Sequence, residues 1–259
     1  MGLTILGMTA GSLFKACPEQ RHWIIFPIFI SIGIRFRPLM NIILWLMSAA
    51  AGAAVLVVVV ILLLTPWMDR WGAMKDEIAA TFPGDELVPN PRSFVNRAVT
   101  IQAAPEEIFP WLRQIGAGKG GFYTYTWIEA LIGCRLVNAD RIHPEWQDLQ
   151  VGDLVRMCPG DPAPPPYVVA QIHPDEALVL GHQEDNAWVD LWQYALVPRG
   201  DGSTRLILRT RTMMTGGFWS IIHPGVFVME RGMLLGIKAR VEKNSLPLRS
   251  RILGDPDTA

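Results

Sequence analysis

The fold is decided by three stretches near the C-terminus: VDLWQYALV (residues 189–197), TRLILRTRTMM (residues 204–214) and PGVFVMERGMLLGIKARVEK (residues 224–243). In the first two, apolar and polar residues tend to alternate, which is the period of a β-strand. The third repeats apolar residues at helical spacing. Its apolar face carries Val226, Met229, Met233 and Ile237. We therefore predict two paired strands followed by a long amphipathic helix.

More strands precede this pair. Residues 152–157, 167–172 and 177–182 also alternate and are separated by turn-forming clusters. Together with the first two stretches they predict five consecutive strands, hence an antiparallel meander. Residues 93–102 predict one earlier strand, and residues 104–115 and 125–132 two short helices. The expected fold class is α+β, a helix-grip in which a curved antiparallel sheet wraps a long C-terminal helix.

Before this domain lies a long apolar run. Residues 39–64 are 26 residues without a charge. As a helix they would be about 39 Å long, against a hydrocarbon core of about 30 Å. We predict one transmembrane helix here, because the uncharged region of a cleaved signal is only about 7–15 residues long.

The segment before this helix allows several interpretations. Residues 1–38 form an N-terminal extension whose apolar run, residues 23–34, contains Pro27 and is too short to span a membrane comfortably. The run is interfacial, re-entrant or half of a hairpin. Alternatively, translation starts at Met40.

Orientation follows from the basic residues beside the span. Four precede it and two follow shortly after, which favours an N-terminus inside the cell and a domain on the extracytoplasmic side. A start at Met40 would remove this bias. After the span we expect a connector over residues 65–91, the helix-grip domain over residues 92–245 and a tail over residues 246–259.

Six stretches carry a resemblance to a known family. They are WGA (71–73), PGDELVP (83–89), PWLRQIG (110–116), GGFYTYTWIE (120–129), NADRIHPEWQDLQVGD (138–153) and MERGMLLGIKARVE (229–242). Here the chain resembles the SRPBCC superfamily (START-like and Bet v1-like proteins, including polyketide cyclase-type members). It is most similar to membrane-anchored bacterial members of unknown function. The resemblance implies the helix-grip fold and leaves the function open, because one fold hosts many activities.

A pocket between sheet and C-terminal helix is the natural site of this architecture. We expect a membrane-anchored protein that binds a hydrophobic or amphipathic small molecule such as a lipid, polyketide or isoprenoid-like compound. One alternative is a cyclase or dehydratase acting on a polyketide-like substrate. Its only clustered acid/base candidates are Asp140, His143 and Glu145. Another is a membrane-tethered interaction module with a filled core.

Four groups of residues are candidates for ligand binding. Asp140, Arg141 and Trp146 form a polar and aromatic cluster, unless they build only a structural turn. Arg209 shares a strand face with Arg205 and Arg211, and that face meets either water or the cavity. Trp192 and Tyr194 share another face. Met229 and Met233 lie on the C-terminal helix and are adaptable apolar side chains.

Other chemistry is not indicated. The five histidines have none of the usual metal-binding spacings, so we expect no metal. The glycine-rich stretch at residues 116–121 is a turn rather than a phosphate loop, because no hydroxyl residue follows Lys119. We expect no cofactor, and a net charge of −1 does not indicate nucleic acid. Catalytic residues cannot be assigned, and the oligomeric state stays open.

Two expectations concern finer detail. Cys134 and Cys158 could pair on the extracytoplasmic side, but we expect free thiols. On the C-terminal helix we expect Gly236 to face the sheet at close range, while Arg231 and Lys238 face water.

Overall fold

The computed structural model describes residues 19–160, 163–214 and 216–253. The chain divides into two compact units, Met1–Val60 and Ile61–Ala259. The expected N-terminal extension falls partly on residues 1–18, and the expected tail partly on residues 254–259. Both stretches lie outside the described residues.

Helix α1 runs from Glu19 to Asp69. The apolar run of residues 23–34 is therefore part of one continuous helix rather than a separate element. Within it, Pro38–Asp69 is long and apolar enough to cross a membrane, and the side chains of its most apolar window are not buried by the protein.

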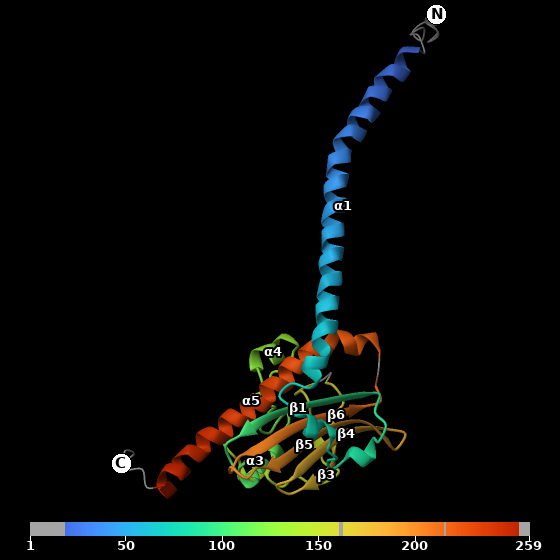
Figure 1. Ribbon diagram of the computed structural model, residues 1–259. Coiled ribbons are helices and arrows are strands. Elements are labelled where there is room, and N and C mark those ends of the chain that lie inside the picture. Colours follow the sequence, from blue (N-terminus) through green and yellow to red (C-terminus); the bar gives the residue numbers. More distant parts are fainter. Residues whose placement is uncertain (1–18, 161–162, 215, 254–259) are drawn as a thin grey trace, which may run out of the picture. The chain divides into compact units, whose positions relative to one another are not determined.

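The second unit is an α+β domain around a six-stranded antiparallel sheet (Figure 1). The strands are β1 (Ser93–Ile101), β2 (Leu154–Val155), β3 (Tyr167–His173), β4 (Ala177–Glu184), β5 (Ala187–Pro198) and β6 (Thr204–Thr212). Their order is β1-β6-β5-β4-β3-β2, so the five later strands form the predicted meander and β1 joins it beside β6. The α+β helix-grip architecture is confirmed.

Helices cover one face of the sheet, which we call the inner face. They are α3 (Pro105–Arg113) and α5 (Gly217–Leu253), and both contact strands of the sheet. Of the two short helices, α2 (Lys75–Ala79) contacts the opposite face of the sheet, and α4 (Thr126–Leu131) lies in the connection between α3 and β2. Between α5 and the sheet lies the main apolar core, in which Met233, Leu234 and Ile237 of α5 are almost completely buried.

Helix α5 is longer than predicted. It starts at Gly217 rather than Pro224 and continues past Pro247 to Leu253. Gly236 does make a close approach, but to the loop before α4 and not to the sheet. A Cβ atom there would lie 1.8 Å from the backbone oxygen of Tyr123. Lys238, which was expected to face water, instead donates a hydrogen bond from its ammonium group to Thr100 O (2.6 Å) and is only partly exposed.

The opposite, outer face carries a covering that the sequence did not predict. Residues 72–91, which we call the strap, pack across it and include α2 and a 3-10 turn at Asp85–Leu87. Glu77 and Asp85 of the strap are buried against arginine side chains of β6. The expected connector is thus part of the folded domain.

Candidate functional site

The inner face is apolar over most of its length. Alternate residues of the central strands point to α5, as the two-residue period dictates. Among them, Trp192 and Tyr194 lie beside Met233 of α5, and the Tyr194 hydroxyl is 3.3 Å from the Met233 sulfur. Three of the predicted ligand-binding residues are therefore together on the inner face.

One end of this face is polar. Tyr167, His182 and Asp190 come from the adjacent strands β3, β4 and β5, where His182 is paired with Asp190 in the strand register. The Tyr167 hydroxyl donates to Asp190 Oδ2 (2.7 Å), and His182 Nδ1 lies 3.4 Å from the same oxygen. We call these three residues the acid–base group.

The surroundings set the charges of the acid–base group. Burial, reinforced by the neighbouring Asp190 carboxylate, raises the pKa of Tyr167 well above the ordinary range, which keeps its hydroxyl protonated. The bond to Asp190 raises the pKa of His182, and a second acceptor, Pro165 O, lies 3.3 Å from its Nε2. Two acceptors around one ring favour the imidazolium form. Asp190 is buried, whereas about a quarter of the His182 side chain is exposed.

A buried ion pair adjoins the acid–base group. Arg97 of β1 donates to Glu230 Oε2 of α5, and Trp192 Nε1 donates to Glu230 Oε1 (2.8 Å). Burial lowers the pKa of Arg97 to about 10, so the guanidinium remains charged at neutral pH. Trp192 links the two polar groups, because its ring also stacks on Tyr167 with centroids 5.4 Å apart.

Three buried polar atoms near this end have no hydrogen-bond partner among the described residues. They are Arg97 Nη2, Thr210 Oγ1 and His223 Nδ1. Thr210 is paired with Trp192 in the sheet and shares its face. Buried donors and acceptors are normally satisfied, so these atoms mark a place where water or a ligand would gain hydrogen bonds.

The other predicted residues lie elsewhere. Asp140 and Arg141 are exposed on the loop after α4, and Trp146 stacks on His143 with ring centroids 4.1 Å apart. Met229 is half-buried, with its sulfur 3.6 Å from the Thr124 hydroxyl. His143 and Glu145 form a partly exposed pair rather than a buried acid/base site.

The arginine face of β6 meets neither water nor the inner core, which corrects the expectation for Arg209. Arg209 lies on the outer face and binds Asp85 (2.6 Å), while Arg205 binds Glu77 (2.5 Å). Only about 1% of Arg209 is exposed, because the strap covers it. The physical reason is that the strap supplies carboxylates and carbonyl oxygens for every one of these guanidinium groups.

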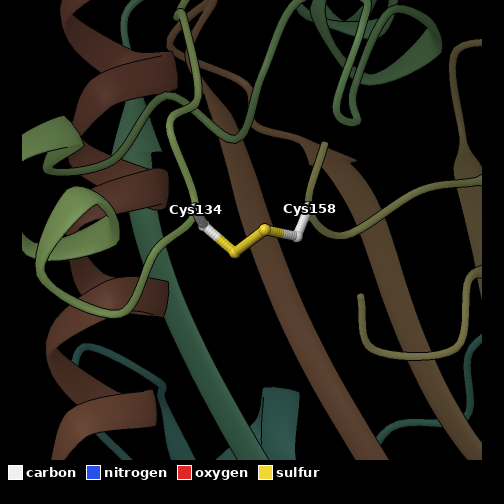
Figure 2. Close-up of a disulfide and its surroundings, with 2 residues drawn as sticks. All are labelled: Cys134 and Cys158. Atoms are coloured by element: carbon white, nitrogen blue, oxygen red, sulfur yellow. A yellow bond between two sulfur atoms is a disulfide. The ribbon is translucent and has the colours of Figure 1, made fainter. Parts of the chain in front are cut away.

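The expectation of free thiols is wrong. Cys134 and Cys158 form a disulfide that joins the segment after α4 to the segment after β2 (Figure 2). The two cysteines are 24 residues apart, and spacing alone could not reveal that the folded chain brings them together.

Sequence reasoning missed Arg97, Tyr167, His182, Asp190 and Glu230. Strand parity held a usable signal, because Asp190 shares the face of Trp192 and Tyr194. Glu230 interrupted an otherwise apolar helix stripe, which is the signature of a buried charge with a partner. Among the described residues no group of three potential metal ligands is found.

No protein-family model matches the chain, and a search of curated proteins finds no match either. Solved structures with some similarity include a Mesorhizobium loti protein (15% identity, TM-score 0.37), which covers 58% of this chain and 98% of its own. Another is CalC from Micromonospora echinospora, described as a self-sacrificing resistance protein. Its identity is 13% and its TM-score 0.34, and the match covers 60% of this chain and 97% of CalC. A third is the Aha1 dimer from Colwellia psychrerythraea, at 16% identity and TM-score 0.36. The match covers 58% of this chain and 96% of the Aha1 chain.

Proposed function

We propose that this protein is a membrane-anchored, SRPBCC-type binding protein for an amphipathic small molecule. The supporting observation is the polar end of an otherwise apolar inner face. Among the described residues, Thr210 Oγ1 is buried there without a hydrogen-bond partner, and Arg97 Nη2 has no hydrogen bond and only the Asp69 carboxylate 3.9 Å away. An apolar pocket with a few convergent polar groups is the usual form of a small-molecule site.

The charges at this end indicate the chemistry of the ligand. Arg97 is balanced by Glu230, and His182 by Asp190. An additional buried charge would have no partner and would be costly. The ligand therefore carries an uncharged polar end, such as a hydroxyl or carbonyl group, and its apolar part packs against Trp192 and Met233.

The anchor is the helix Pro38–Asp69, which crosses the bilayer, with the domain on the extracytoplasmic side. Support for this side comes from the Cys134–Cys158 disulfide, because disulfides persist in oxidising compartments and are rare in the cytosol.

Ligand capture tests the binding function. The full chain in detergent is delipidated, incubated with a membrane extract, re-isolated and analysed by mass spectrometry. Met233→Trp places a larger ring against Tyr194 on the inner face, and Ala239→Trp places the same ring on an exposed position of α5. We expect one compound class to be retained by the unmodified chain and by Ala239→Trp and to be lost in Met233→Trp.

Equal recovery from all three proteins would mean that the compounds belong to the detergent belt around α1. The domain would then be the interaction module with a filled core. Thermal melts of the three proteins separate loss of binding from loss of folding.

A second candidate function is supported by the acid–base group. A buried carboxylate that contacts both a protonated tyrosine and a partly exposed histidine of raised pKa is suited to proton transfer, as a cyclase or dehydratase requires. If the captured compound is converted during incubation, His182→Gln is expected to abolish the conversion while leaving capture intact.

A further inference from the structure

The segment from α4 to Val137 exposes an unusual number of large apolar side chains. Trp127, Leu131, Ile132 and Val137 are 65%, 77%, 74% and 80% exposed. Arg135 is the one exposed charged residue between Thr126 and Val137, because Glu129 is buried. We call this segment, residues 126–137, the apolar loop. A solvated surface loop would be polar, so this composition indicates a contact surface.

The apolar loop is held firmly in place. At its start, Tyr125 packs on α5, where a Cβ at Gly232 would meet the tyrosine ring at 2.7 Å. Near its end, Cys134 is joined to Cys158 by the disulfide (Figure 2). The exposed side chains are therefore presented by a fixed segment and do not result from a loose end.

The apolar loop lies near the end of α1. Trp67, in the last turns of α1, packs on Phe227 of α5 with ring centroids 5.3 Å apart, and His223 binds Asp69 (2.7 Å). Gly232, which contacts Tyr125, is five residues further along α5, a rise of about 7.5 Å. Figure 1 shows α4 beside α5. Ile221 and Val228, which flank Phe227 in the sequence of α5, are exposed apolar side chains as well.

From this arrangement we propose that the apolar loop inserts into the interfacial layer of the bilayer that α1 crosses. The inference rests on the proposed anchor. Trp67 is 56% exposed at the end of the apolar helix, where tryptophan typically sits at headgroup level. In this arrangement the exposed side chains of Val228 and Trp127 are expected to lie at the same level as Trp67. Its apolar side chains enter the boundary of the acyl chains, and Arg135 faces the anionic headgroups.

Quenching by brominated lipids tests this contact. The full chain is reconstituted into vesicles of phosphatidylcholine and phosphatidylglycerol, with and without bromine near the top of the acyl chains. The emission of Trp127 is obtained as the difference between the unmodified chain and Trp127→Phe. We expect this difference signal to lose most of its intensity in brominated vesicles and to resist iodide. Leu131→Asp combined with Ile132→Asp is expected to reverse both properties.

The emission of Trp45, obtained from Trp45→Phe, distinguishes the two proposals. If the Trp45 signal is quenched and the Trp127 signal is not, the interfacial contact is refuted and the anchor stands. If neither signal is quenched, the anchor fails as well. A Trp127 signal that resists both brominated lipid and iodide would mean that a protein surface, such as a second copy, covers the apolar loop.

Discussion

Single residues set the chemistry of the inner face. His182 has two acceptors, Asp190 and Pro165 O, and both require an N–H on the ring. Glu230 likewise serves two donors from different strands. Each charge on this face is therefore balanced by a neighbour, which explains how an apolar core tolerates them.

The pairing of His182 with Asp190 makes the stability of the domain depend on pH. Its pKa in the folded state is raised above the ordinary 6.5 by the bond to Asp190. A raised pKa means that the ring stabilises the fold fully below pH 6.5 and that this contribution is lost as pH rises through the folded pKa. An NMR titration of the ring protons should show the raised value.

Asp190→Asn is the matched variant, because an amide oxygen replaces the carboxylate without its charge. We expect the pKa of His182 to fall toward 6.5 in this variant. An unchanged pKa would mean that the carboxylate does not control the ring. His182→Gln should remove this part of the pH dependence of the melting temperature.

At the scale of elements, α5 depends on one close contact. Gly236 faces Tyr123 O, so Gly236→Ala forces helix and loop apart and is expected to lower the free energy of unfolding by about 1–3 kcal/mol. Gly225→Ala is the control, because a Cβ there meets nothing within 4 Å. It should stabilise the helix by about 0.5–1 kcal/mol. Chemical unfolding of both variants in detergent measures the contrast, and equal effects would contradict the contact.

The buried side of α5 allows a second test. Met233→Asp places a carboxylate where only 1% of the side chain is exposed, and is expected to cost about 3–5 kcal/mol of stability. Ala239→Asp introduces the same group on the exposed side of the helix and should change the melting temperature little. The reverse order in a thermal melt would mean that the other side of α5 is buried.

Strands could be predicted from the sequence because the alternation of apolar and polar residues involves only near neighbours in the chain. The strands at residues 93–102, 167–172 and 204–214 were located to within two residues at each end, because alternation is a property of neighbouring residues. The strap was not predictable, since its polar residues read as a connector. Only the folded chain shows that Glu77 meets Arg205, 128 residues away. For the same reason the acid–base group, assembled from three strands, was not identified.

At the scale of the whole molecule, the disulfide defines the chemical environment that the domain requires. It closes a loop of 24 residues, for which the loop-entropy model gives about 3.5 kcal/mol. Cys134→Ser combined with Cys158→Ser should lower the free energy of unfolding by about this amount. Thiol labelling of the full chain should find two more reactive cysteines after reduction, and no increase would refute the disulfide.

The strap has a consequence for how the chain is made. Glu77 and Asp85 are synthesised 128 and 124 residues before Arg205 and Arg209, the side chains they bind. At ribosomal speeds of about 5–20 residues per second, roughly 6–25 seconds pass between the synthesis of these strap residues and the synthesis of their partners on β6. The outer face therefore closes late, from the C-terminal end. A chain interrupted before β6 would carry a finished strap with no surface to cover.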